Sequence, residues 1–197
     1  MKIVIIKYNA GNIRSVLFAL ERIGAEAEVT DNPDLISSAD KIIFPGVGEA
    51  NSAMNYLRER KLDILIQNLQ QPVLGVCLGM QLLCAHSEEN ETKCLGIFSE
   101  TVKKFIPHDQ VPLKVPQVGW NNIYDLDSAL FNGITENSYC YFVHSYYVGL
   151  GETTIAKTDY VQPYSSALQR KNFFGVQFHP EKSAAIGERI LKNFIQF

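Results

Sequence analysis

Hydrophobic positions in the first part of the chain alternate between continuous apolar runs and helix-like repeats. The run KIVIIKY at 2–8 has a continuous apolar centre, and NIRSVLFALERIG at 12–24 then places apolar residues three or four positions apart. Asn12 and Gly24 stand where a helix would begin and end. Uninterrupted apolar strands that alternate with helices are typical of a parallel sheet covered on both faces.

The same alternation continues as far as residue 86. The pattern predicts further strands at 25–31, 41–46 and 72–77, and helices at about 50–70 and at 78–86.

The second half of the chain is rich in tyrosine, phenylalanine and turn residues, and its pattern predicts linked strands. Strands are expected at 101–105, 138–149, 153–159 and within 165–181, and an amphipathic helix at 184–197. No repeat, linker or low-complexity tract is evident. We therefore expect residues 1–197 to form a single α/β domain, with a mostly parallel central sheet flanked by helices and an antiparallel, strand-rich second half.

Composition excludes several classes of function. A net charge of −3 gives no basic excess for nucleic acid, and no apolar run approaches the roughly 18 residues of a membrane span. The first residues lack the pattern of a secretory signal, which favours a cytoplasmic protein. We expect the four cysteines to be free thiols, and we expect no metal or cofactor, because no cysteine pair has a metal-binding spacing. These cysteines are Cys77, Cys84, Cys94 and Cys140.

The segment PVLGVCLGMQLL at 72–83 places Cys77 between two glycines, at the junction of a predicted strand and a predicted helix. This order is typical of a nucleophile elbow, a tight turn that exposes the nucleophile and lets the next residue donate its backbone N–H to an oxyanion. Leu78 is that next residue. The alternative is that Cys77 is simply a packed thiol, which we expect of Cys84.

A thiol with an ordinary pKa of about 8.5 needs a base to attack at neutral pH. His179 ends an apolar strand in NFFGVQFHPE, and residues two apart in an extended segment share a side, so Glu181 can orient its imidazole. Pro180 is expected to keep that segment extended. The alternative is a surface glutamate at a strand end. An acid that follows the histidine by two residues also excludes the α/β-hydrolase order.

The other histidines have weaker claims. His86 and His108 lie among polar residues, and His144 is compatible with a strand histidine whose hydrogen bonds are satisfied.

GVCLGMQLL with a late FHPE resembles the class I glutamine amidotransferases. Within them, YNAGNIRSV, PGVGEA, VPQVGWN and HSYY together resemble the glutaminase subunits of imidazole glycerol phosphate synthases, over nearly the whole chain. The resemblance implies hydrolysis of L-glutamine to glutamate and ammonia. It also implies a heterodimer with a (β/α)₈ cyclase, which uses the ammonia to form imidazole glycerol phosphate and AICAR in histidine biosynthesis.

The resemblance further implies a role for each matching residue. Cys77, His179 and Glu181 would be the catalytic triad, and the backbone N–H groups of Val47 and Leu78 would form the oxyanion hole. Glutamine would be held by Gly46, Gly48, Gln81, Glu89, Ser145 and Tyr146. The partner interface would include Asn12, Gln117, Trp120 and Lys182. For Trp120, the chain's only tryptophan, the alternative is a place in the core.

Two segments depart from the family pattern. Lys7, Tyr8 and Asn9 replace a usual Asp-Tyr-Gly, and Gln117 replaces a common histidine. Both segments resemble partner-facing ones, so the expected chemistry is unaffected.

Three other interpretations were weighed. The glutaminase of pyridoxal phosphate synthesis typically has Gly-Gly-Glu-Ser where this chain has PGVGEA, and a DJ-1-like hydrolase lacks the late His-x-Glu. A non-catalytic interaction subunit would lose a triad member, and none is lost here.

Overall fold

The computed structural model describes residues 1–9, 12–107 and 113–197, so the predicted exposure of His108 lies outside the described residues. The strands are β1 (Ile3–Ile6), β2 (Ala27–Thr30), β3 (Lys41–Gly46), β4 (Val73–Cys77), β5 (His86–Ser87), β6 (Thr92–Lys93), β7 (Thr101–Lys104), β8 (Gln117–Ile123), β9 (Ser138–His144), β10 (Tyr146–Val148), β11 (Thr154–Asp159), β12 (Pro163–Arg170) and β13 (Phe173–Val176). The helices are α1 (Ile13–Arg22), α2 (Pro33–Ser37), α3 (Ala50–Glu59), α4 (Leu62–Gln67), α5 (Leu78–Leu83) and α6 (Ala184–Ile195). Short 3₁₀ turns are η1 (Glu89–Glu91), η2 (Ala129–Phe131) and η3 (Pro180–Lys182).

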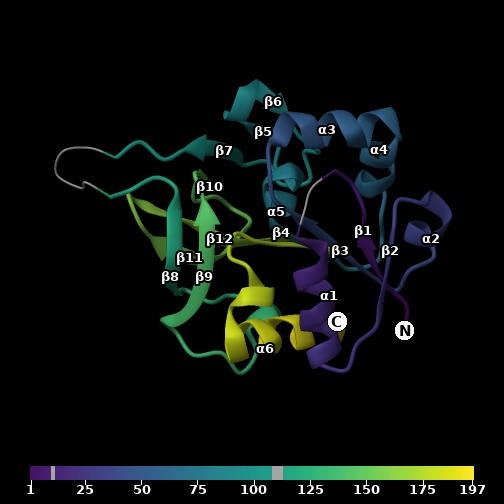
Figure 1. Ribbon diagram of the computed structural model, residues 1–197. Helices are drawn as coiled ribbons and strands as arrows, with labels where there is room; N and C mark the ends of the chain where they lie inside the picture. Colours follow the sequence, from purple (N-terminus) through teal and green to yellow (C-terminus); the bar gives the residue numbers. More distant parts are fainter. Residues whose placement is uncertain (10–11, 108–112) are drawn as a thin grey trace.

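The main sheet confirms the predicted α/β fold (Figure 1). Its strand order is β2-β1-β3-β4-β13-β12-β10-β7-β5-β6, with β11 paired to β12. The five strands from β2 to β13 run parallel, and β13, β12, β10 and β7 are joined by antiparallel pairing. Gly46 pairs with Cys77, and Val76 with Val176, so the carboxyl ends of β3, β4 and β13 meet at one edge.

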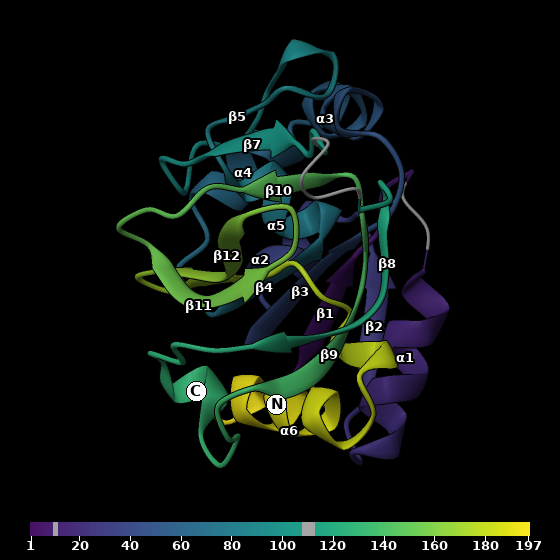
Figure 2. The ribbon, with the colours of Figure 1, turned by 90° about the vertical axis from the view of Figure 1, so that its left-hand side faces the viewer.

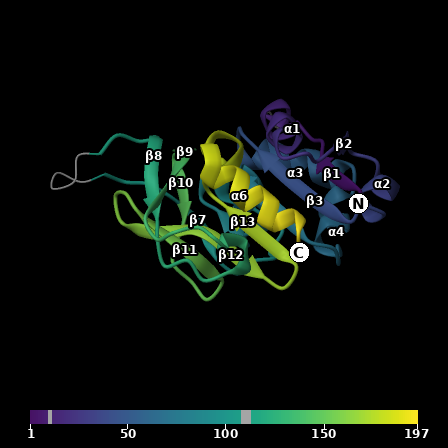
Figure 3. The ribbon, with the colours of Figure 1, turned by 90° about the horizontal axis from the view of Figure 1, so that it is seen from below.

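Helices cover both faces of the parallel strands, as Figures 1 and 3 show. Along β1, Val4 and Ile6 join the core beneath α3, α4 and α5, whereas Ile3 and Ile5 join the core beneath α1 and α6. Both faces of the strand are therefore buried, which explains its uninterrupted apolar sequence.

Strands β8 and β9 form a separate antiparallel pair beside the main sheet. Figure 2 shows β9 next to the segment that leads from β13 into α6. The backbone N–H of His179 donates to the carbonyl of Tyr141 in β9 at 2.8 Å, so this hairpin is attached directly to that segment.

Several boundaries differ from the sequence predictions. The helical region expected at 50–70 is divided by Lys61, whose φ of 55° ends the regular repeat. The helix expected at 78–86 ends at Leu83, because Cys84 is extended and Ala85 hydrogen-bonds to Glu100 instead. The strand β8 was not predicted.

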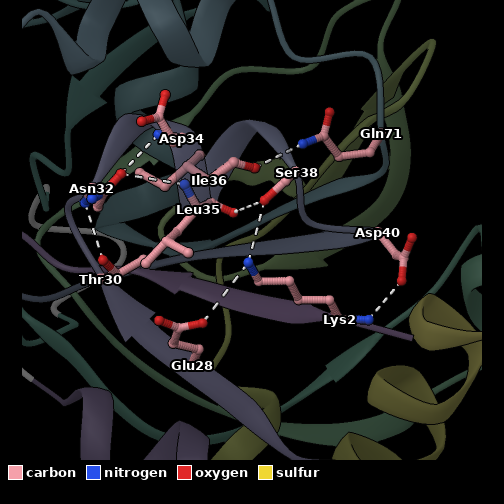
Figure 4. A network of polar contacts seen from close by, with 10 residues as sticks. All are labelled: Lys2, Glu28, Thr30, Asn32, Asp34, Leu35, Ile36, Ser38, Asp40 and Gln71. Atoms are coloured by element: carbon pink, nitrogen blue, oxygen red, sulfur yellow. Dashed lines mark hydrogen bonds and ion pairs between the residues drawn. The ribbon is translucent and has the colours of Figure 1, made fainter.

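Helix α2 was also missed, because its five residues are too few for a periodic pattern. Its start depends on capping, shown in Figure 4: Asn32 Oδ1 accepts the N–H groups of Asp34 at 2.8 Å and Leu35 at 3.3 Å, and Pro33 occupies the first turn. Lys2 Nζ donates to Ser38 Oγ at 3.2 Å, which ties the end of α2 to β1.

The longest helix of the described ranges, α6, has 12 residues. None of the helices described is both long and apolar enough to cross a membrane.

A close approach of α5 to β3 positions the carboxyl end of β4. A Cβ atom placed on Gly79 in α5 would overlap the carbonyl oxygen of Phe44 in β3. Glycine at position 79 therefore lets the helix lie directly against the strand.

Replacement Gly79→Ala should lower the free energy of unfolding by about 1–3 kcal/mol, since the added methyl group meets backbone atoms that cannot rotate away. Helix propensity alone predicts the opposite sign, because alanine favours a helix by about 1 kcal/mol over glycine. Gly149→Ala is the control, since nothing lies within 4 Å of its added Cβ. Urea unfolding of both variants measures the difference, and an unchanged or stabilised Gly79→Ala would contradict the packing argument.

Candidate active site

Cys77 lies at the sharp turn between β4 and α5. Its φ of 54° and ψ of −111° belong to a region that non-glycine residues rarely adopt, and the flanking glycines fit tightly. A Cβ on Gly75 would lie 2.8 Å from the backbone nitrogen of Met80. The predicted elbow is therefore present, and both of its glycines are required by packing.

The thiol of Cys77 differs from the other three in its surroundings. Cys77 lines a pocket, and its Sγ lies 3.8 Å from the carbonyl oxygen of Val143. Cys84 is fully buried, as expected of a core thiol. Burial raises the pKa of Cys94 and of Cys140 to about 12, which keeps both protonated. Of the four cysteines, Cys77 alone faces this pocket.

The predicted contact between His179 and Glu181 is present. His179 Nδ1 lies 2.8 Å from Glu181 Oε1, and both side chains are almost completely buried, so the surface-glutamate alternative is wrong. The expectation that Pro180 keeps the segment extended is wrong. Pro180 begins the 3₁₀ turn η3, and the Lys182 N–H donates to the His179 carbonyl at 3.0 Å. Proline fits the first position of a helical turn, where no N–H is needed.

The contacts of His179 favour its charged form. Burial lowers the pKa of the imidazole, but the hydrogen bonds and charges of Cys77 and Glu181 raise it more, to about 10 from an ordinary 6.5. Cys77 and Glu181 are thus both electrostatically coupled to this one ring.

Asn12 contacts the same carboxylate oxygen of Glu181 as His179 does. Its φ is 74°, and its side chain does not cap α1 as predicted, because the amide donates to Glu181 Oε1. The second carboxylate oxygen, Oε2, is buried and has no hydrogen-bond partner among the residues that the structure describes. Asn12 therefore orients Glu181 in the free chain, and its predicted place at a partner interface stays a prediction.

The pocket beside Cys77 has a volume of about 320 Å³ and collects most of the predicted site residues. Its lining is Val47, Gly48, Cys77, Leu78, Gln81, Glu89, Pro116, Val143, His144, Ser145, Tyr146, His179 and Lys182. Gly46 lies behind this wall, where an added Cβ would overlap the hydroxyl of Tyr8. That hydroxyl donates to the carbonyl of Pro45 at 2.6 Å, a support for the loop that the sequence did not indicate.

Glu89 and Gln81 already use some of their hydrogen-bonding atoms in contacts within the protein. Glu89 Oε2 accepts the N–H of Ala50 at 2.8 Å, and burial raises the pKa of its carboxyl. Gln81 Nε2 donates to the carbonyl of Tyr146 at 3.0 Å and to Gln177 Oε1 at 2.9 Å. The amide nitrogen of Gln81 is therefore fully used, and its Oε1 is the atom left to accept from a ligand.

His144 has satisfied hydrogen bonds, as the sequence suggested. Its Nδ1 lies 2.7 Å from the carbonyl of Tyr146 and its Nε2 lies 3.3 Å from the hydroxyl of Tyr164. Burial lowers the pKa of His144 to about 4, so it is neutral near pH 7. It is a structural histidine in the pocket wall.

The expectation that Gln117 faces a partner is wrong for its side chain. Gln117 is 3% exposed, and its side-chain amide lies 3.1 Å from the Tyr164 hydroxyl. Because side chains alternate along β8, an inward Gln117 leaves Val118 and Trp120 outward.

Trp120 is 53% exposed, so the core alternative for it is wrong. Its ring meets the ring of Tyr141 in β9 edge-on, with centroids 5.9 Å apart. Lys182 Nζ, from the turn η3, lies 5.8 Å from the centroid of the same Tyr141 ring. Trp120 belongs to a surface of exposed apolar side chains on β8 and β9, which we call the hairpin face. It comprises Val118, Trp120, Tyr139 and Val143.

Other hollows do not contain comparable chemistry. One of about 470 Å³ lies beside Arg189 and one of about 540 Å³ beside Tyr160, and neither lining includes a cysteine or histidine. Across the ranges that the structure describes, no three His, Cys, Asp or Glu side chains converge to hold a metal ion.

Comparisons with known proteins agree with this geometry. The family model for glutamine amidotransferase class-I matches residues 4–197. The imidazole glycerol phosphate synthase subunit HisH of Bacteroides thetaiotaomicron is 55% identical over 99% of both chains, and that of Escherichia coli 46% over 100% of both. Among solved structures, a glutamine amidotransferase superposes with a TM-score of 0.75 at 17% identity, covering 98% of this chain and 97% of its own. PurLQS of Thermotoga maritima superposes with 0.71 at 16%, covering 99% and 97%; these show the fold alone.

The raised pKa of His179 should be visible by NMR titration. The wild-type imidazole should titrate well above 6.5, and Glu181→Gln should lower its pKa because a raising contact is lost. Since the folded pKa exceeds the unfolded one, the charged ring stabilises the fold fully below about pH 6.5 and loses that effect as the pH rises toward 10.

The control for this titration is His144, whose pKa of about 4 should be unchanged in Glu181→Gln. An unchanged pKa of His179 in that variant would show that Glu181 does not stabilise the imidazolium.

Proposed function

The chain belongs to the class-I glutamine amidotransferase family, and from that premise we propose that it is the glutamine-hydrolysing subunit of an imidazole glycerol phosphate synthase. The observation that carries the proposal is a thiol on a strained elbow, in a pocket that also contains a buried histidine paired with a carboxylate. The relatives that match along nearly their whole length are named as subunits of imidazole glycerol phosphate synthase, and these names support the assignment to this synthase.

In the proposed first half-reaction, His179 takes the proton of Cys77, and the sulfur attacks the side-chain amide carbon of L-glutamine. Glu181 accepts the Nδ1–H of the ring and stabilises the imidazolium. His179 then returns the proton to the nitrogen as the C–N bond breaks. Ammonia leaves, and a glutamyl thioester remains on Cys77.

In the second half-reaction, His179 removes a proton from water, whose oxygen attacks the thioester carbon. The C–S bond breaks, glutamate leaves, and the thiol regains its proton. Both half-reactions pass through an oxyanion. The N–H of Leu78, the first residue of α5, has no acceptor within the helix, and Val47 and Gly48 line the pocket beside it, which supports an oxyanion hole there.

Glutamine binding is proposed for the opposite wall of the pocket. The partly buried carboxylate of Glu89 suits the substrate ammonium, and Gln81 Oε1 is an available acceptor. The backbone at Ser145 and Tyr146 would receive the substrate carboxylate. Gly46 and Gly48 would let the loop reorient toward the oxyanion.

The proposed partner is a (β/α)₈ cyclase that forms imidazole glycerol phosphate and AICAR from the delivered ammonia, in a cytoplasmic heterodimer. Its proposed contact is the hairpin face, with Lys182 at the edge. The support is that carbonyls of β9 contact both reacting residues: Tyr141 accepts the N–H of His179, and Val143 lies beside Cys77 Sγ. A partner that moves β9 would thus move the site.

Replacing the nucleophile should abolish the chemistry and spare the fold. Cys77→Ala is expected to release no ammonia from glutamine, whereas Cys84→Ala, which removes a core thiol outside the pocket, keeps the activity. An electrophilic glutamine analogue should label Cys77 before the three buried thiols, as read by mass spectrometry. Labelling of Cys84 with Cys77 unmodified would contradict the assignment.

Hydrolysis by the isolated chain should be slow, and the cyclase with its nucleotide-like ligand should stimulate it strongly, since uncoupled hydrolysis wastes glutamine. Trp120→Ala and Lys182→Ala should reduce that stimulation or weaken the complex, while the thermal midpoint of the free chain barely changes, because Trp120 is largely exposed.

The matched control is Ile64→Ala, which removes a similarly exposed apolar side chain, 58% accessible, from α4 on a distant part of the molecule (Figure 1). Its stimulation should equal that of the wild type. Full activity of the isolated chain, unchanged by the cyclase and its ligand, would overturn the proposed coupling.

A further inference from the structure

Gln177 is a buried amide that touches the sulfur of Cys77. It follows β13 directly and is fully inaccessible to solvent. Its Nε2 lies 3.7 Å from Cys77 Sγ, within hydrogen-bond distance for sulfur, and its Oε1 accepts from Gln81 Nε2 at 2.9 Å. Of the functions assigned above, none uses this side chain.

The direction of the Gln177 amide is set by its neighbours. A backbone carbonyl can only accept, so the carbonyl of Tyr146 requires the NH₂ group of Gln81 to face it. The second N–H of that same group then meets Gln177, which must present its oxygen. The NH₂ group of Gln177 is thereby turned toward the thiol.

The carbonyl of Tyr146 is itself held from a second side. His144 Nδ1 lies 2.7 Å from it, and because that acceptor has no proton, the ring carries its hydrogen on Nδ1. His144 and Gln81 thus both donate to this carbonyl, Gln81 also donates to Gln177, and Gln177 donates to the reacting atom. A buried amide costs free energy unless its partners are in place, and here the last partner is Sγ.

We propose that Gln177 is a positioning residue for the Cys77 sulfur, and this inference rests on the proposed glutaminase function. Its N–H donates to Sγ in the resting thiol and more strongly once the sulfur is a thiolate, since hydrogen bonds to charged acceptors are stronger. The bond fixes the sulfur while His179, two residues further along the chain and also in contact with Cys77, exchanges the proton. Gln177 is not itself part of the pocket lining and reaches the site through Cys77 and Gln81, so it acts on the nucleophile rather than by touching the substrate.

The first test replaces Gln177 with methionine, which keeps the length and volume and removes the donor. Gln177→Met should lower kcat about tenfold or more with little change in KM, and should slow the alkylation of Cys77 by iodoacetamide by a similar factor. Alkylation is followed on the Cys77 peptide by mass spectrometry, without glutamine. Gln71→Met is the control, because Gln71 also donates a partly buried hydrogen bond, to the Ile36 carbonyl at 3.0 Å, but at the opposite end of β4.

The second test uses Gln177→Glu, which keeps the shape and still accepts from Gln81. A carboxyl can donate to sulfur only while it is protonated, so the rate of Cys77 alkylation relative to the wild type should fall as the pH rises from about 5 to 8. A side chain that only fills space would give a ratio independent of pH.

The two proposals fail in different ways. A wild-type chain that hydrolyses glutamine, with kcat and alkylation unchanged in Gln177→Met, would overturn the role of Gln177 alone. A wild-type chain that releases no ammonia from glutamine, with or without a cyclase, would overturn the proposed function.

Discussion

The candidate active site depends on one close contact, the passage of α5 directly against β3. Only glycine at position 79 permits it, since any Cβ there would overlap the Phe44 carbonyl. With α5 held so near, β4 has almost no room to turn, and Cys77 takes a positive φ that presents its sulfur to the pocket. The backbone strain is borne by the packing of two parallel strands on either side of β4. The position of the Cys77 sulfur at the pocket is therefore a consequence of sheet packing.

The remaining parts of the site come from elements that the topology brings to this turn. Because β13 pairs in parallel with β4, the residues that follow it reach the elbow from the side, and they bring Gln177 and His179 to the sulfur. Strand β9 lies across them and hydrogen-bonds through its carbonyls, which do not depend on side-chain identity. The backbone of β9 thus connects the hairpin face to the thiol, because the carbonyl of Val143 lies beside the sulfur of Cys77.

The order of neighbouring residues was enough to predict those parts of the site that lie within a single segment of the chain. The strand at 41–46, the elbow at Cys77 and the contact of His179 with Glu181 all follow from neighbours within a few positions. The failures share a different cause. The resemblance alone places Gln117 at a partner interface, and without a predicted β8 its inward side could not be known. The amide of Gln177 lies in the segment NFFGVQFHPE, but its partner Cys77 is 100 positions away.

The four thiols show how the same side chain acquires opposite properties from its surroundings. Burial raises the pKa of Cys94 and of Cys140 to about 12, although Arg58 lowers the first and Ser183 the second, and both thiols stay protonated. Cys77 is scarcely more exposed, at 6%, yet its neighbours are polar: an imidazole whose pKa is raised, an amide donor and the residues of the pocket lining. The groups that reach its sulfur set Cys77 apart, because the accessible area alone hardly distinguishes the four thiols. Since those groups arrive from β9 and β13, any force that shifts these strands changes the nucleophile without touching it.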